Sequence, residues 1–262
     1  MLGTAESIRA MAAAAMQDYF NRRYRSENIV LAATGNVDFD GLVAQVEKQS
    51  ASWNERPTAD TPKPDDETRL PEGISLDRTL EIADAHQAYL VRISPGPDMK
   101  SEDRYAVKIL ASILGDEGGS RLFWELIDTG RAEVATVWPH EFLDTGAWFT
   151  YMVCAPEDTA SNRTFIQQIM KQIVEAGVEP DELSQAINKA TAGCIMQSER
   201  PSNRLFGLGS RWLSCGEYIS TDDTLEKLRG LDVQAVSAAA KRYLTGDEAE
   251  IIATAGESPV MS

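Results

Sequence analysis

The order of hydrophobic and polar positions at the start of the chain predicts a helix, a short strand and a second helix. Apolar side chains recur at helical spacing over residues 7–25, and the run IVLAATGN at 29–36 is typical of a buried strand that ends at Gly35. Asp38 then stands where a helix N-cap is preferred, so a second helix is expected to follow it.

The segment 52–77 has a different composition from its neighbours. It holds four prolines among charged and small residues: Pro57, Pro62, Pro64 and Pro71. Proline removes a backbone donor and stiffens the chain, so we expect an extended linker.

A second region of alternating elements begins near residue 78. The run 79–94 is long enough for one strand with a bulge, and 102–115 is an amphipathic helix. Gly118 and Gly119 predict a turn, after which Ser120 can cap a helix that ends at Gly130. The apolar runs AEVATVW and GAWFTYMVCA, joined by PHEFLDTG, then predict an antiparallel hairpin.

The remainder of the chain is mostly helical in pattern and ends in the strand-like run AEIIATAG. Helical stretches are expected at 162–177, at 180–198, over a shorter stretch at 203–214 that glycines interrupt, and at 231–244, where Asp232 is the cap.

The beginning and the end of the chain resemble each other. The segment IRAMAAAAMQDYFNRRYRSENIVLAATGN aligns, with small gaps, with LRGLDVQAVSAAAKRYLTGDEAEIIATAGE, so that the Arg-Tyr pair at 23–24 falls on the pair at 242–243. The second copy closes a unit that opens near residue 78, whereas the first copy has nothing in front of it. If the copies are structural repeats, the chain is cut from a longer tandem protein; chance similarity between two helix–strand pairs is the alternative.

Composition narrows the classes of partner. The 262 residues carry 25 Lys and Arg against 41 Asp and Glu, a formal net charge of -16, which argues against nucleic acid or an anionic membrane as the main partner. No apolar run approaches the ~20 residues of a transmembrane helix, and the first twenty residues are not typical of a secretory signal. The three cysteines, Cys154, Cys194 and Cys215, are widely spaced and are expected to be buried free thiols.

On these segments the chain resembles the pitrilysin/insulinase family of zinc metallopeptidases, which includes the mitochondrial processing peptidases and bacterial two-domain members. The similar segments are SIRAM at 7–11, NRRYRSENIVLAATGNVD at 21–38, GGSRLFWELIDTG at 118–130, TVWPHEFLDTGAWF and VEPDELSQAINKATAG. The resemblance implies an α+β fold of repeated domains, each with an antiparallel-rich sheet packed against helices. It implies that two halves enclose a chamber for unfolded peptides. It also implies that 1–51 is the tail of the first, catalytic-type domain, 52–77 the linker, and 78–262 a second, inactive peptidase-like domain.

The resemblance implies that zinc is bound by a part of the first domain that this chain lacks. The family's motif, His-x-x-Glu-His with a distant Glu, lies early in the first domain. This chain has only His86 and His140, which lack helical histidine partners, so no metal and no catalytic residue is assigned here and zinc is expected in the missing first-domain portion. A metal site built from both histidines and an acid stays open as an alternative. Otherwise His140 is expected to be packed or solvent-facing, and His86 to lie in a strand.

The family's peptide-holding Arg and Tyr of the second domain align with Ile127 and Val134, neither of which can donate a hydrogen bond through its side chain. The remaining candidate substrate-binding residues lie in the glycine-rich turn, namely Gly118, Gly119, Ser120 and Arg121. The alternative to substrate binding is a tight turn for the two glycines and an ion pair with a nearby acid for Arg121. The aromatic residues of the hairpin, Trp138, Trp148, Phe149 and Tyr151, predict core and inner-sheet packing, with addition of a peptide strand as the alternative.

Two hypotheses follow from the resemblance. The chain is either the C-terminal half of a zinc endopeptidase, a hydrolase that cuts peptides only when joined to a zinc-bearing half, or a non-enzymatic scaffold subunit that pairs with an active homologue. The expected partners are a peptide or unfolded protein substrate, the catalytic half or a homologous subunit, and a second copy in a homodimer. Family members occur in several compartments, so a bacterial protein of this kind is expected in the periplasm or the cytoplasm.

Overall fold

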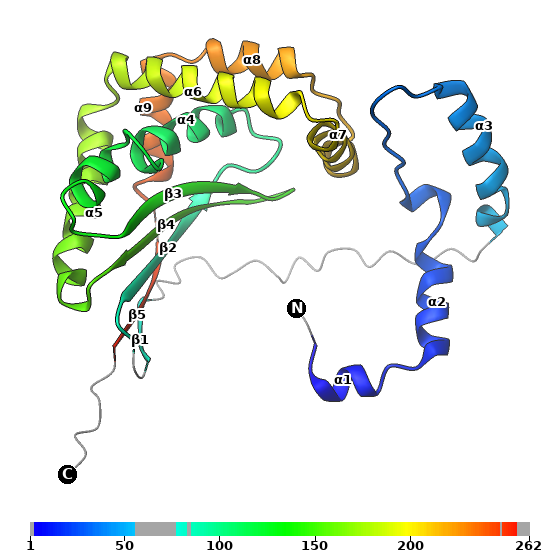
Figure 1. Ribbon diagram of the computed structural model, residues 1–262, viewed down its shortest axis with the longest axis horizontal. Coiled ribbons are helices and arrows are strands. Elements are labelled where there is room, and N and C mark those ends of the chain that lie inside the picture. The colour runs from blue at the N-terminus through cyan, green and yellow to red at the C-terminus, as the bar shows by residue number, and fades with distance from the viewer. Residues whose placement is uncertain (1–2, 56–76, 83–84, 247, 256–262) are drawn as a thin grey trace. The chain divides into compact units, whose positions relative to one another are not determined.

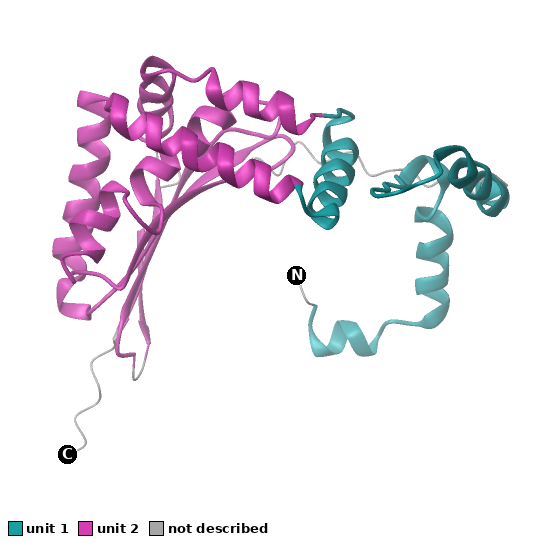
Figure 2. Cartoon of the chain, turned by 45° about the horizontal axis from the view of Figure 1, so that its top comes forward, with its two compact units in different colours: residues 1–69, 199–218 teal, residues 70–198, 219–262 magenta. Residues whose placement is uncertain are grey.

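The computed structural model describes residues 3–55, 77–82, 85–246 and 248–255. The chain divides into two compact units, drawn in different colours in Figure 2. Unit 1 comprises residues 1–69 and 199–218, and unit 2 comprises residues 70–198 and 219–262. Most of the predicted linker, 56–76, lies outside the described residues.

Unit 2 contains a five-stranded mixed sheet with the strand order β1-β5-β2-β4-β3. Its strands are β1 (Asp77–Ile82), β2 (Ala88–Gly96), β3 (Val134–Glu141), β4 (Gly146–Cys154) and β5 (Ala249–Ala255). Three of the four pairings are antiparallel, and only β1 and β5 run parallel. The expected antiparallel-rich sheet and the hairpin of β3 and β4 are therefore confirmed.

Helices cover one face of this sheet (Figure 1). They are α4 (Asp103–Gly115), α5 (Thr159–Ala176), α6 (Pro180–Ser198), α8 (Thr221–Arg229) and α9 (Val233–Tyr243), with a 3₁₀ turn η5 (Pro156–Asp158). Apolar side chains of these helices and of the covered sheet face form one core, whose fully buried members include Leu90, Ile109, Leu110, Leu114, Met152, Ile166 and Ile173. The α+β fold class is confirmed.

Helix starts in unit 2 follow the capping chemistry of the sequence. Asp232 Oδ1 accepts a hydrogen bond from the Ala235 N–H at 2.8 Å, as expected for the cap of α9. Ser220 and Asp223 form a reciprocal capping box at the start of α8, a helix that the periodicity did not indicate. The capping residues were thus a signal for α8 that the apolar pattern alone missed.

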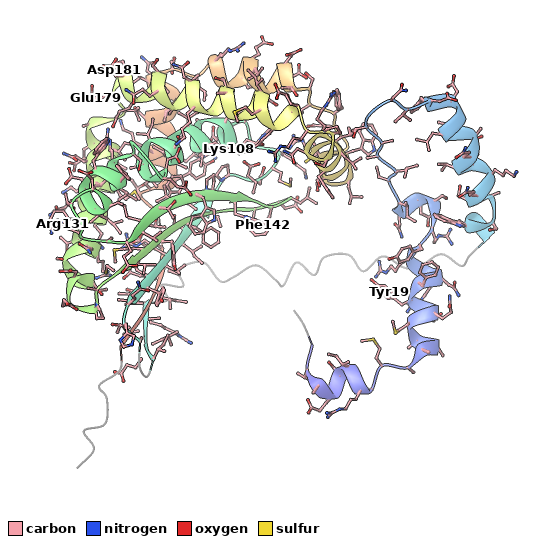
Figure 3. The ribbon with its side chains drawn as sticks, viewed as in Figure 1. Tyr19, Lys108, Arg131, Phe142, Glu179 and Asp181 are labelled. Atoms are coloured by element: carbon pink, nitrogen blue, oxygen red, sulfur yellow. The ribbon has the colours of Figure 1, made fainter. Side chains whose placement is uncertain are left out.

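Unit 1 is helical, with little burial. It contains α1 (Ala5–Arg9), α2 (Ala13–Arg23), η1 (Ser26–Asn28), α3 (Phe39–Ser50), η2 (Ala51–Glu55) and α7 (Pro201–Cys215). None of these elements has a buried residue among those described, and Tyr19 on α2 is 56% exposed (Figure 3). Asp38 caps α3 as predicted, since Oδ1 accepts from the Gly41 N–H.

Three predictions for unit 1 were wrong. The single helix over 7–25 is two helices, because the chain leaves α1 at Ala10, whose N–H is shared between two carbonyls in a tight last turn. Residues 29–36 have strand-like composition but no strand partner among the described residues. The glycines of 203–214 do not interrupt α7, which is continuous and ends at the left-handed Gly216.

Three further expectations for unit 2 differ from the structure. The run 79–94 is two strands, since β1 and β2 lie on opposite sides of β5. The helix after Ser120 contains the π-helical turn η4 (Phe123–Ile127), which the Asp128 N–H closes on the Phe123 carbonyl. All three cysteines are free, but only Cys154 is buried. No helix in the described part of the chain is long and apolar enough to cross a membrane.

Candidate functional site

The second face of the sheet carries apolar and aromatic side chains that no described element of unit 2 covers. Successive residues of a strand point to opposite faces, so the partners of the buried positions in β2, β3 and β4 share this surface. We call it the open face and define it by Tyr89, Val91, Ile93, Trp138, Phe149 and Tyr151.

Aromatic rings gather at one end of the open face. Trp138 stacks on Phe149, opposite in register, with ring centroids 5.3 Å apart and planes 5° apart, and it meets Tyr151 edge-on at 6.5 Å. Phe149 in turn lies opposite Ile93. Trp148, one residue away, points into the core, so core packing is confirmed for Trp148 but wrong for the half-exposed Trp138. The open face can hold apolar side chains of a ligand.

The edge strand β3 offers little backbone to an added strand. Gly115 at the end of α4 lies so close that a Cβ there would stand 2.5 Å from the Val137 nitrogen, and its carbonyl accepts from Thr136 Oγ1 at 2.7 Å. Pro139, further along β3, has no N–H. This arrangement disfavours addition of a peptide strand along β3 and leaves the open face as the better contact surface.

The glycine-rich turn lies on the helical side of unit 2. Gly118 and Gly119 are exposed, and a Cβ at either would meet nothing within 4 Å, although Gly119 has a φ of +83° that favours glycine. Ser120 is buried: its Oγ donates to the Asp116 carbonyl at 2.8 Å and accepts from the Phe123 N–H. Ser120 is therefore a helix cap, as the sequence predicts, and its hydroxyl is already bonded within the fold.

Arg121 holds the start of α6 in place. Its guanidinium donates to both carboxylate oxygens of Glu182, at 2.8 Å each, and to the Gly177 carbonyl at 3.3 Å. Burial raises the pKa of Glu182, but the hydrogen bonds from Arg121 and from the Glu179 N–H outweigh it and hold that pKa below its ordinary value. Arg121 thus forms an ion pair, the structural alternative that the sequence offered for it. Substrate binding by the four turn residues stays a prediction.

A similar balance acts at the other side of the turn. Asp116 pairs with Lys189 of α6 at 2.6 Å. Burial raises the pKa of Asp116, but hydrogen bonds from Lys189, the Glu117 N–H and Ser112 together lower it below its ordinary value. The turn is therefore fixed to α6 on both sides, at Glu182 and at Lys189.

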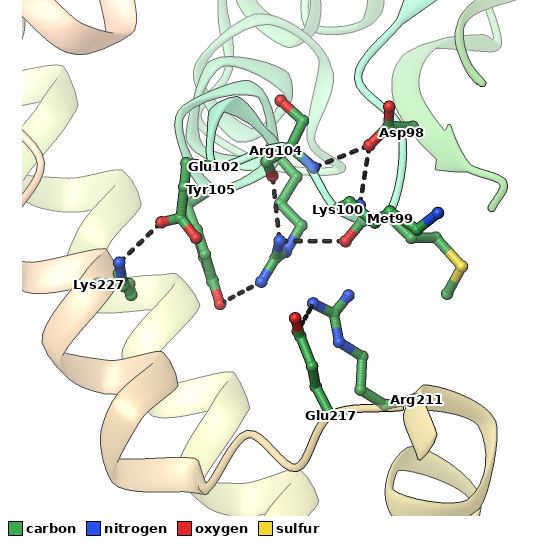
Figure 4. A network of polar contacts seen from close by, with 10 residues as sticks. Asp98, Met99, Lys100, Glu102, Arg104, Tyr105, Arg211, Glu217 and Lys227 are labelled. Carbon is green, nitrogen blue, oxygen red and sulfur yellow. Dashed lines mark hydrogen bonds and ion pairs between the residues drawn. The ribbon is translucent and has the colours of Figure 1, made fainter. Parts of the chain in front are cut away.

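The start of α4 is tied by a third polar network (Figure 4). Asp98 accepts from the Lys100 and Ser101 N–H groups, and the buried Arg104 donates to the Met99 and Ser101 carbonyls and to the Tyr105 hydroxyl. Both terminal nitrogens of the Arg104 guanidinium are therefore bonded within unit 2. These contacts give it no reactive role.

The two histidines lie apart from any group of described acids that could complete a metal site. His86 is exposed in the connection between β1 and β2, and His140 in β3 packs its ring 4.5 Å from that of Phe142 (labelled in Figure 3). Among the described residues, no group of three or more His, Cys, Asp or Glu side chains is placed to hold a metal ion. The described residues do not fit a zinc site, and we derive no step through zinc for them.

Sequence reasoning missed a charged cluster inside unit 2. Arg92 and Glu250, opposite in register on β2 and β5 and almost fully buried, pair at 2.5 Å. Glu250 also contacts Arg163 of α5, and Arg92 contacts Glu248 at 3.3 Å. The signal was an arginine inside the apolar run YLVRIS and a glutamate inside AEIIATA, because a charge within a buried strand needs a partner.

Comparison with known proteins identifies the family. The family profile described as "Peptidase M16 inactive domain" matches residues 10–190. A relative named an uncharacterized zinc protease of Mycobacterium tuberculosis is 31% identical over 252 residues, covering 94% of this chain and 56% of the relative. The mitochondrial-processing peptidase subunit beta of Dictyostelium discoideum is 23% identical over 256 residues, covering 93% of this chain and 53% of that protein.

A solved structure has the same fold. The crystal structure of a peptidase M16 inactive domain from Pseudomonas fluorescens matches with a TM-score of 0.83 at 19% identity, covering 98% of this chain and 60% of that one. The chain spans about half the length of the curated relatives it matches. The resemblance found in the sequence is confirmed: the chain belongs to the peptidase M16 family, in its inactive-domain group.

Proposed function

We propose that this chain is the non-catalytic half of an M16 zinc endopeptidase, that its open face lines a peptide-binding chamber, and that proteolysis needs a separate zinc-bearing half. The observation that supports the proposal most strongly is the open face itself. A soluble domain rarely leaves stacked aromatic and branched side chains uncovered across a sheet unless they contact a ligand or partner. A peptide or an unfolded protein presents the matching apolar side chains.

Unit 1 supports pairing with a catalytic half. Its helices carry large apolar side chains on their surface, among them Met11, Tyr19, Phe39, Phe206 and Leu213. The run 29–36 has the composition of a strand and lacks a partner strand among the described residues. Both features fit a partner that supplies a sheet, with zinc bound by that partner.

Reconstitution tests this function. The chain is mixed with the separately produced remaining half of the Mycobacterium tuberculosis relative, and cleavage of a quenched fluorescent peptide is followed with and without a chelator. We expect no cleavage by the chain alone and chelator-sensitive cleavage by the mixture. Chelator-sensitive cleavage by the chain alone would contradict the proposal.

A pair of tryptophan variants tests the open face. Trp138→Ala removes its stacked ring, and Trp124→Ala removes an indole from η4 on the helical side, where Trp124 is 55% exposed against 39% for Trp138. We expect the first to raise the KM of the reconstituted enzyme several-fold and the second to leave it unchanged. Equal effects would show that the open face does not contact the peptide.

The alternative function is a non-enzymatic subunit that pairs with an active homologue. It is favoured by Ile127 and Val134, which stand where the family resemblance expects an Arg and a Tyr. Under this alternative the mixture forms a complex in light scattering, and the added chain does not increase cleavage. A homodimer of the chain alone would appear in the same measurement at twice the monomer mass.

A further inference from the structure

The charged residues of the unit 2 strands are divided unequally between the two faces of the sheet. The carboxylates on these strands belong to Asp77 and Glu81 of β1, Glu141 of β3 and Glu250 of β5. Glu250 pairs with Arg163 of α5, and Glu141 pairs with Lys108 of α4, so both face the helices. Asp77 lies opposite Glu250 in register, and Glu81 points to the same side as Asp77. The described strands therefore present no carboxylate on the open face, although the chain has a net charge of -16.

A cation stands at the β1 edge of the open face. Arg78 lies opposite Ile251 of β5, and Ile251 lies opposite Val91 of the open face. Residues opposite one another in a sheet point to the same side, so the exposed Arg78 shares the side of the open face. Glu133, which precedes β3 at the other edge of the sheet, accepts a hydrogen bond from Gln87 at 2.6 Å. Among the described strand residues, Arg78 is the one Lys, Arg, Asp or Glu on this side.

Arg78 and the aromatic pair of the open face lie within the span of a short extended peptide. Trp138 and Phe149 are opposite each other. Phe149 is also opposite Ile93, two residues along β2 from Val91. Three strand spacings of about 4.8 Å and two residues of about 3.3 Å separate Arg78 from Phe149, a distance of about 16 Å. An extended peptide advances about 3.3–3.6 Å per residue, and its side chains at i and i+4 point to the same side. A peptide residue on the aromatic pair therefore places the side chain four positions away within reach of the long Arg78 side chain.

We propose that the open face selects an extended apolar segment with an aromatic side chain and, four residues away, a carboxylate, and that it disfavours Lys or Arg at that second position. The aromatic ring packs on Trp138 and Phe149, and the carboxylate pairs with Arg78. An ammonium group there would meet a like charge and would lose water without gaining an acceptor. The acidic excess of the whole chain therefore does not favour basic peptides at this face. The inference rests on the proposed function, because it names the class of peptide that the chamber holds.

NMR of the ¹⁵N-labelled full chain tests this selectivity through the indole N–H signal of Trp138. The chain has five tryptophans, and Trp138→Phe assigns the signal of Trp138 by its loss. The titrants are acetyl-Phe-Thr-Val-Thr-Glu-amide and the same peptide with Gln or Lys at the last position. We expect the Glu peptide to move the Trp138 signal with the lowest Kd, the Gln peptide to bind several-fold more weakly, and the Lys peptide to bind most weakly. The signal of Trp124, on the helical side, is expected to stay in place.

Charge reversal at Arg78 gives the sharpest comparison. Arg78→Glu alters an exposed side chain, so the variant is expected to fold normally and to bind the Lys peptide more tightly than the Glu peptide. Lys171→Glu makes the same change on α5, at a side chain that is 72% exposed, and as the matched control it is expected to keep the wild-type order. Equal Kd values for the three peptides, or an unchanged order in Arg78→Glu, would overturn the selectivity and leave the proposed function in place. A Trp138 signal that none of the peptides moves would overturn peptide binding at the open face, and this inference with it.

Discussion

The helix–strand pair that opens the chain and the pair that closes it have similar sequences and different surroundings. Helices α2 and α9 both contain 11 residues, and both are followed by an apolar run. Leu228 and Tyr243 are 5% and 9% exposed in unit 2, whereas the aligned Ile8 and Tyr24 are 58% and 47% exposed in unit 1. The same pattern therefore builds a core in one unit and a surface in the other.

The apolar runs that follow the two helices also differ in their surroundings. In unit 2, β5 pairs with β1 on one side and with β2 on the other, so its backbone groups are bonded along both edges. The aligned residues 29–36 pair with no strand in the described part of the chain, and Thr34 Oγ1 instead donates to the Pro201 carbonyl at the start of α7. Strand propensity reflects fit to neighbouring strands more than an intrinsic backbone preference, and residues 29–36 have no neighbouring strand among those described.

Truncation of the aligned apolar residues tests this contrast most strongly. Leu228→Ala removes a buried side chain and is expected to lower the free energy of unfolding by about 2–5 kcal/mol, because it leaves a cavity. Ile8→Ala removes an exposed one and is expected to change it by less than about 0.5 kcal/mol. Urea unfolding followed by circular dichroism measures both.

The same variant can be tested in the complex with the proposed catalytic half. If that half covers unit 1, Ile8→Ala is expected to weaken its association with the chain, although it barely changes the stability of the chain alone. A large loss of stability from Ile8→Ala in the isolated chain would show that unit 1 is already packed, and the contrast between the units would fail.

The sequence predicted the elements better than their partners. Asp232, Asp38 and Ser120 cap helices as expected, because capping depends on residues three positions apart. The strand at 29–36 was wrong and the run 79–94 was joined into one, because pairing depends on segments distant in sequence. At the candidate site, the side on which Trp138 and Trp148 lie required the register of β3 on β4.

The two units also differ in how closely other atoms approach a helical glycine. A Cβ at Gly115 in α4 would stand 2.5 Å from the Val137 nitrogen, whereas one at Gly207 in α7 would meet nothing within 4 Å. Gly115→Ala is therefore expected to lower the free energy of unfolding by about 1–3 kcal/mol through strain. Gly207→Ala is expected to be neutral or to stabilise α7 by up to about 1 kcal/mol, because alanine favours the helix. Thermal unfolding of both variants checks this, and equal losses would contradict it.

The ion pair of Arg121 and Glu182 gives unit 2 a dependence on pH. The folded pKa of Glu182 lies below its ordinary value of 4.5, so its contribution is complete above that pH and is lost as the pH falls through the folded pKa. Glu182→Gln is expected to cost about 1 kcal/mol at neutral pH, since the pair is only partly buried, and to flatten the loss of stability in acid. Urea midpoints at neutral and acid pH measure the difference; parallel losses in the variant and the wild type would exclude this role.

The smallest expected effect comes from an ion pair in unit 1. Arg22 Nε contacts Asp18 Oδ2 at 3.0 Å across one turn of α2, with both side chains about half exposed or more. Asp18→Asn is expected to lower the stability of this helix by only about 0.3–0.5 kcal/mol, because water and salt screen such pairs. Helicity by circular dichroism should fall slightly at low salt and match the wild type at high salt, where the charges are screened. A loss that persists at high salt would mean that Asp18 is held by packing, and α2 would then resemble the buried α9 more than its exposure indicates.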